Sequence, residues 1–77
     1  MDVLSRTQSI FRDVFDDENL ILKRETSAHD IKDWDSLAQV NIVVACESEF
    51  GIKFELNDIM KLISVGDIVD AIERILK

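Results

Sequence analysis

The chain of 77 residues contains no proline, no tyrosine and only two glycines, Gly51 and Gly66. Because β-sandwiches and barrels need many turns rich in glycine and proline, this composition favours helices joined by short connections. The length allows one domain with a small core. We therefore expect residues 1–77 to form a single all-α domain.

The sequence has one cysteine, Cys46, which excludes an internal disulfide and gives no indication of an oxidising compartment. Its apolar neighbours predict a small buried side chain rather than a reactive thiol. The first residues include an early acid and no apolar segment of the signal-peptide type, and no apolar run is long enough to span a bilayer. We expect a cytoplasmic protein that does not bind membranes.

Positive charge is also scarce, since 9 Lys and Arg residues stand against 16 Asp and Glu residues, for a net charge of −7. Such a chain is repelled by nucleic-acid backbones and anionic membranes, and it attracts basic surfaces. Solubility alone would also account for this acidity in a small protein. We expect no nucleic-acid partner.

Groups suited to catalysis or metal binding are few. His29 is the only histidine, and with Ser36 and a nearby aspartate it could form a hydrolytic triad. Against this, the chain is too small to bury a substrate, and Ser36 lacks the flanking glycines of a nucleophile elbow. One His and one Cys cannot form a zinc site, and the acids at 13–18 lack the spacing and glycine of a calcium-binding loop. We expect no catalytic residue and no bound metal.

The first half of the chain contains an amphipathic helix and a long loop. Apolar residues at spacings of three and four predict a helix over 3–15, which ends where consecutive acids oppose the helix dipole. Residues 16–35 show no clear helical period, with room for one helical turn near 18–22. A loop this long is expected to pack on the core, through Leu20 or Leu22 and through Ile31.

A second helix is predicted over 36–50, which contains neither glycine nor proline. Asp35 is its N-cap and Gly51 its C-terminal stop. A helical projection places on one side Val40, Val43, Cys46, Glu47 and Phe50, with Ile42 flanking. It places on the other side Ala38, Asn41, Ala45 and Ser48. The second side is small and uncharged, where a solvent face usually carries Lys and Glu, so it is a candidate docking surface. A central helix buried in a bundle would also explain part of this pattern.

A short helix and a final helix complete the prediction. An extended connector pinned by Ile52 and Phe54 leads to a helix over 58–63, capped by Asn57. Ser64 caps the last helix, with Asp67 in the capping-box position that Glu or Gln usually fills. Inward residues in these two helices are expected to be Ile59, Leu62 and Ile63, then Val65, Ile68, Ala71, Ile72, Ile75 and Leu76.

Ser36 is the most unusual polar residue of the chain. It is predicted to be the first residue of an apolar helix, exposed at the positive end of the helix dipole. Since Asp35 already caps that helix, the serine hydroxyl is left for another purpose. A presented hydroxyl on a compact acidic scaffold suits a protein that is modified at Ser36 and passed between enzymes.

The order of these motifs resembles the acyl carrier protein family over essentially the whole chain. The resemblance rests on Asp35-Ser36-Leu37 opening the second helix, on Glu47 to Ile52 closing it, and on Ser64-Val65-Gly66-Asp67 opening the last. It implies a four-helix bundle of three main helices and a short third, with a long first loop. It also implies a carrier rather than an enzyme. By the same resemblance, a phosphopantetheinyl transferase would attach 4′-phosphopantetheine from coenzyme A to Ser36 with Mg²⁺, and acyl groups would be carried on it as thioesters.

Further roles follow from the same resemblance. Asp35 would help to engage the transferase, and Leu37, Asn41 and Ile42 would contact partner enzymes, namely a loading ligase or acyltransferase and downstream synthases. A monomer is expected. The family often has a glycine two or three residues before the serine, where this chain has Asp33-Trp34, and we expect Trp34 to pack on the loop rather than to guide the arm.

The cargo and pathway are less constrained. Carriers of fatty-acid synthesis are typically acidic along the outer face of the second helix, whereas that face is predicted here to be neutral. This difference favours a specialised lipid, polyketide or related pathway. Peptidyl and D-alanyl carriers share the fold, so they remain alternatives, as does a non-catalytic helical module that docks through its second helix.

Overall fold

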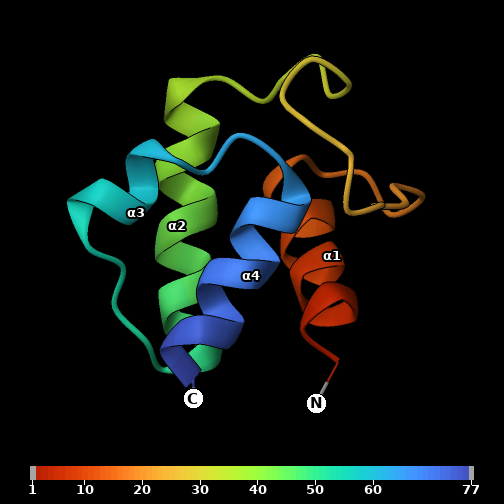
Figure 1. Ribbon diagram of the computed structural model, residues 1–77. Coiled ribbons are helices and arrows are strands. Elements are labelled where there is room, and N and C mark those ends of the chain that lie inside the picture. Colours follow the sequence, from red (N-terminus) through yellow and green to blue (C-terminus); the bar gives the residue numbers. More distant parts are fainter. Residues whose placement is uncertain (1, 77) are drawn as a thin grey trace.

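The computed structural model describes residues 2–76, which form a bundle of four helices (Figure 1). The helices are α1 (Val3–Val14), α2 (Ser36–Phe50), α3 (Leu56–Met60) and α4 (Val65–Leu76). α1 and α2 run in opposite directions, and α4 crosses in front of them in this view. The described residues contain no strand, only one isolated antiparallel bridge between Ser27 and Ser64. The predicted all-α bundle with a short third helix is confirmed.

The core is built by α1, α2 and α4 together with residues of the connections. The fully buried apolar side chains are Phe11, Ile42, Cys46, Val65, Ile68 and Ile72. The connections add Leu22, Trp34, Phe54 and Leu62, whereas α3 has no buried residue. Leu20 and Ile31 pack against this core half-buried, so the predicted anchoring of the long loop is confirmed. No helix among residues 2–76 is both long and apolar enough to cross a bilayer.

Local capping explains where α1 and α4 begin. The carboxylate of Asp2 accepts hydrogen bonds from the backbone N–H of Ser5 at 3.2 Å and from its hydroxyl at 2.7 Å. At α4, the backbone N–H of Asp67 donates to the Ser64 hydroxyl at 3.2 Å, and the Ser64 N–H donates to the Asp67 carboxylate at 3.1 Å. The predicted capping box is therefore present, with aspartate in the place of glutamate.

The long loop crosses the top of the bundle and is fastened to the start of α4 (Figure 1). The N–H groups of Val65 and Gly66 donate to the carbonyls of Thr26 and Arg24, both at 2.8 Å. A β-carbon on Gly66 would lie 2.9 Å from the Arg24 carbonyl oxygen. This close approach, which only glycine permits without displacement, fixes the height of the loop above the core and hence its path toward α2.

The shortest helix differs from its prediction. α3 begins at Leu56 and ends at Met60 instead of spanning 58–63, and Asn57 lies inside it rather than capping it. Ile63, predicted inward, is 63% exposed. Between α1 and α2 the loop contains turns but no helix near 18–22. Such short segments have weak local preferences, so packing against the rest of the chain decides their bounds.

The rotation of α2 also differs from the prediction. Ala38, expected on the outer side, is buried, whereas Val40, expected inside, is 58% exposed. Ile42, expected to face partner enzymes, is fully buried. The helix is apolar nearly all round, so its sequence carries no strong helical period, and contacts with α1 and α4 choose which side faces inward.

Candidate functional site

Ser36 is the first residue of α2 and is exposed to solvent, at the end of the helix where the long loop arrives (Figure 1). The carboxylate of Asp35 accepts a hydrogen bond from the backbone N–H of Ala38 at 2.9 Å. The carbonyl of Asp35 accepts from the N–H of Gln39 at the same distance. Asp35 is therefore the N-cap, as predicted, and the Ser36 hydroxyl is not needed for that task.

A shallow groove of about 470 Å³ opens beside Ser36. Its walls come from the end of the loop, the first turn of α2, α3 and the link between α3 and α4. Besides Ser36, the residues that shape it include Trp34, Gln39, Ile59, Met60, Leu62 and Ile63. α3 and the link that follows it thus contribute apolar side chains to the same groove that Ser36 lines.

A second hollow of about 270 Å³ adjoins Asp35 from the side of α1. Its lining includes Phe15, Asp33, Leu37 and Asn41. Asp35 lines both hollows, so it lies between the groove beside Ser36 and the outward face of α2.

The outward face of α2 is apolar rather than merely small and neutral. Leu37 is 71% exposed, and Val40 and Val44 are each 58% exposed. Asn41 lies among them and is exposed. Ile42 belongs to the core instead, so its predicted contact with partners is wrong. Val40 and Val44 were missed, although their spacing of three and seven residues from Leu37 would have placed them on one side of the helix.

The structure gives no support to the hydrolytic alternative. His29 is exposed in the loop, and its backbone N–H donates to the Ser27 hydroxyl at 3.3 Å. Its imidazole is not among the groups that line the groove beside Ser36. Across residues 2–76, no three side chains of His, Cys, Asp or Glu lie where they could hold a metal ion together.

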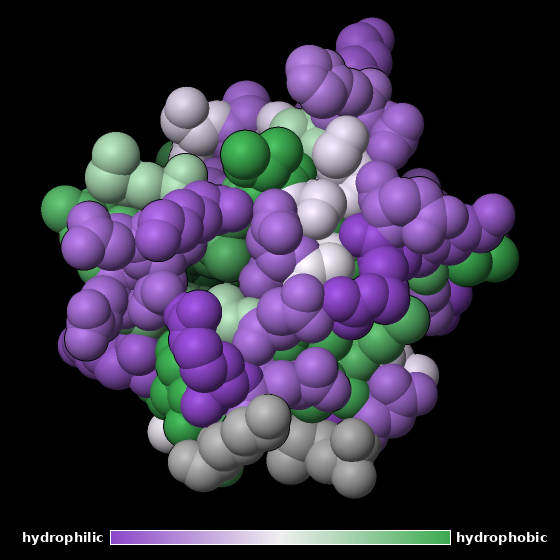
Figure 2. All heavy atoms as spheres, viewed as in Figure 1, coloured by the Kyte–Doolittle hydropathy of each residue, from purple (hydrophilic) through white to green (hydrophobic). Residues whose placement is uncertain are grey.

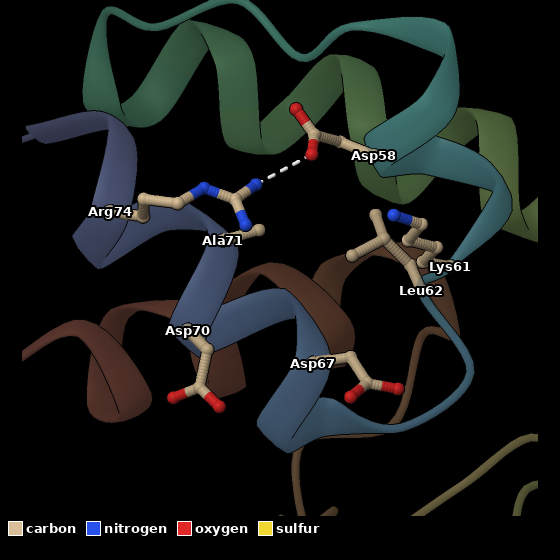
Figure 3. A pocket seen from close by; sticks show the side chains of 7 residues that line it. All are labelled: Asp58, Lys61, Leu62, Asp67, Asp70, Ala71 and Arg74. Carbon is tan, nitrogen blue, oxygen red and sulfur yellow. Dashed lines mark hydrogen bonds and ion pairs between the residues drawn. The ribbon is translucent and has the colours of Figure 1, made fainter.

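A separate cavity of about 190 Å³ lies between α3 and α4 (Figure 3). Arg74 reaches across it to the carboxylate of Asp58 at 2.5 Å. Of the other acids on its walls, Asp67 caps α4 and Asp70 accepts from Arg24 at 2.8 Å. Its acidic groups are therefore already engaged within the fold, and Ser36 takes no part in its lining.

Cys46 is fully buried in α2, as predicted. Burial, with smaller contributions from the charges of Glu47 and Glu49, raises the pKa of its thiol to about 12. A protonated thiol with no access to solvent is a poor nucleophile. Cys46 therefore does not compete with a thiol that is attached elsewhere on the protein.

Comparison with known proteins shows which family the chain belongs to. The family described as "Phosphopantetheine attachment site" matches residues 8–72. The chain belongs to this family. An acyl carrier protein from Thermotoga maritima is 35% identical over 73 residues, which are 95% of this chain and 90% of that protein. One from Acidothermus cellulolyticus is 34% identical over 71 residues, 92% of this chain and 84% of its own.

The fold agrees with this assignment. A solution structure of the holo acyl carrier protein from Geobacter metallireducens superimposes with a TM-score of 0.91. It is 46% identical, and the match covers 99% of this chain and 87% of the other. The chain is therefore an acyl carrier protein whose cofactor is covalent 4′-phosphopantetheine, as the sequence predicted. As a carrier, it is acted on by a phosphopantetheinyl transferase and by biosynthetic enzymes.

Proposed function

We propose that Ser36 is the residue that receives 4′-phosphopantetheine, and that this carrier serves a specialised lipid, polyketide or related pathway. The observation that supports Ser36 as the attachment residue is that a different residue caps α2. Asp35 caps the helix at 2.9 Å, so the neighbouring hydroxyl is exposed and uncommitted. When bound, the arm supplies a terminal thiol that holds acyl or aminoacyl groups as thioesters.

The residues at this position fit a phosphodiester. The first N–H groups of a helix lack partners inside the helix, and the helix dipole favours negative charge there. Only the Ala38 N–H is occupied by the Asp35 carboxylate. That carboxylate offsets part of the attraction for phosphate. As the family resemblance implies, we propose that Asp35 has a second role in engaging the transferase.

The outward face of α2 supports a specialised pathway. The patch made by Leu37, Val40, Asn41 and Val44, here called the α2 patch, has no charged side chain. A partner that relies on basic residues would find little to pair with on it, whereas a partner with a complementary apolar surface would bury it favourably. We propose that Leu37 and Asn41 contact the loading ligase or acyltransferase and the later synthases. We also propose that the carrier is a monomer.

The attachment is tested by mass. Incubation of the chain with coenzyme A, Mg²⁺ and a broad-specificity phosphopantetheinyl transferase should add one phosphopantetheine. Ser36→Ala should abolish the gain, and Ser48→Ala, a change at an exposed serine near the other end of α2, should leave it intact. If wild-type protein gains no mass while a known carrier in the same tube does, the proposal is wrong.

The role of Asp35 can be separated from its capping. Asp35→Asn keeps a good cap and removes the charge, whereas Asp35→Ala removes both. If the transferase uses the carboxylate, both variants should load at least about tenfold more slowly, while only the alanine variant should lose about 1 kcal/mol of stability. Loading of the asparagine variant at the wild-type rate would restrict Asp35 to capping.

The cargo can be identified on the protein isolated from its own cells. Mass spectrometry of the intact arm would show an acyl group for a lipid or polyketide pathway. An amino-acid mass would instead assign the chain to the peptidyl or D-alanyl class of carriers and overturn the proposed pathway class.

A further inference from the structure

Gln39 joins three parts of the chain through its side-chain amide. Its carbonyl oxygen accepts a hydrogen bond from the indole N–H of Trp34 at 2.7 Å. Its amide nitrogen donates to the backbone carbonyl of Leu62 at 3.3 Å. The end of the long loop, the first turn of α2 and the link before α4 are thus held together by one side chain.

This bridge lies in the groove beside Ser36, because Trp34, Gln39 and Leu62 all line it. Trp34 and Leu62 are also core residues, exposed by only 7% and 8%. An apolar chain tethered at Ser36 and entering the core on this side would have to part Gln39 from Trp34 or from Leu62. A part-buried N–H or carbonyl would then lose its partner, which opposes the opening.

The outer wall of the groove offers an alternative resting place. It is formed by α3 and by the link between α3 and α4, where Met60 is 72% and Ile63 is 63% exposed. Figure 2 shows hydrophobic atoms at the left of the view, over α3, on a face that is otherwise mainly hydrophilic. A short cargo can lie against this wall without disturbing the hydrogen bonds of Gln39.

We infer that Gln39 is a specificity-determining residue: its bridge between Trp34 and Leu62 keeps the core closed next to Ser36. The cargo then lies in the open groove against α3. This arrangement favours short or polar acyl and aminoacyl groups, and it gives long saturated chains no stabilising burial in the core. The inference rests on the proposed attachment at Ser36, and it assigns the chain-length preference to the two hydrogen bonds of the Gln39 bridge.

The experiment compares carriers whose 4′-phosphopantetheine arm bears an acetyl, an octanoyl or a dodecanoyl thioester. The test variant is Gln39→Met, which has a similar length and no hydrogen bond. The matched control is Gln8→Met, because the Gln8 side chain also accepts a part-buried hydrogen bond, from the Leu22 N–H at 2.8 Å, and takes no part in the groove. Mass spectrometry first confirms loading in each variant. A failure of attachment at Ser36 is therefore seen separately from a failure of the Gln39 bridge to determine the position of the cargo.

Two readouts follow the position of the cargo. Cleavage of the thioester by hydroxylamine should proceed at similar rates for all three cargoes in wild-type protein and in Gln8→Met. In Gln39→Met, the dodecanoyl thioester should be cleaved at least about tenfold more slowly than the acetyl one, because a buried thioester reacts only after local opening. The melting temperature should rise with chain length in Gln39→Met alone.

The inference is overturned if wild-type carrier protects the dodecanoyl thioester as strongly as Gln39→Met does. It is also overturned if neither protein protects it. Should Gln39→Met fail to fold, Trp34→Phe removes the indole N–H and keeps a smaller aromatic ring at that position, and the same protection is expected from it.

Discussion

The indole of Trp34 stands edge-on to the ring of Phe11, with centroids 5.1 Å apart and ring planes at 84°. Phe11 is fully buried in α1, and Trp34 lies two residues before Ser36. Edge-to-face pairs of this kind add about 0.5–1.5 kcal/mol to the burial of the rings. α1 contributes no residue to the groove, yet through this contact it positions the loop that presents the serine.

Replacing Phe11 should therefore disturb the approach to Ser36. Phe11→Leu keeps an apolar side chain and loses the aromatic pair, at an expected cost of about 1–3 kcal/mol. Trp34 is the only tryptophan, so its emission should shift to longer wavelength as water gains access to it. Urea unfolding and fluorescence measure both effects, with Phe15→Leu as the control. An unchanged emission spectrum would show that Phe11 does not hold the indole.

Thr7 is a polar residue in the apolar core. It is fully buried in α1, and its hydroxyl has no hydrogen-bond partner among residues 2–76. Thr7→Val replaces that hydroxyl by a methyl group of similar shape and should stabilise the protein by about 1 kcal/mol. Thr7→Ala should destabilise it, because it leaves a cavity. A loss of stability in the valine variant would mean that the hydroxyl has a partner in solution.

The two glycines should respond differently to substitution. Gly66 has no room for a β-carbon beside the Arg24 carbonyl, whereas Gly51 has open space but a φ of +63°. Gly66→Ala should cost on the order of 1–3 kcal/mol through crowding, and Gly51→Ala about 1 kcal/mol through backbone strain. Because asparagine tolerates the left-handed conformation, Gly51→Asn should recover part of its loss and Gly66→Asn should recover none. Thermal unfolding of the four variants is the check.

The buried thiol of Cys46 makes the number of reactive thiols a measure of loading. Native unloaded protein should not react with a thiol reagent at neutral pH, because the pKa of Cys46 is raised to about 12 and the side chain is fully buried. After loading, one thiol per chain should react, on the arm. Reaction of the native unloaded chain on the same timescale would show that α2 opens readily, and unfolding in urea should expose Cys46 in both forms.

The same group predicts a stability change at high pH. The pKa of Cys46 is about 12 in the folded chain and about 8.5 when unfolded. Above about pH 8.5 the unfolded state loses this proton and the folded state keeps it. The contribution of this thiol to the free energy of unfolding is therefore fully present below that pH and declines toward about pH 12. Cys46→Ala should lower stability at neutral pH and remove this part of the decline. The free energy of unfolding, measured in urea at successive pH values, tests the sign.

Signals carried by a few neighbouring residues were enough to predict much of this carrier. The bounds of α2 follow from the cap at Asp35, from the absence of breakers up to Phe50, and from the stop at Gly51. The capping box of Ser64 and Asp67 likewise predicts the start of α4. These features are correct because each depends on backbone groups within one turn of the residue concerned. Ser36 stood out for the same reason.

Packing between distant segments decided the rest. A helix that is apolar on all sides does not reveal which side is buried, so the inward position of Ile42 and the outward position of Val40 depend on α1 and α4. The bounds of α3 are set in the same way, since five residues have little helical preference of their own. The bridge from Trp34 through Gln39 to Leu62 exists only because folding brings together residues that are up to 28 positions apart.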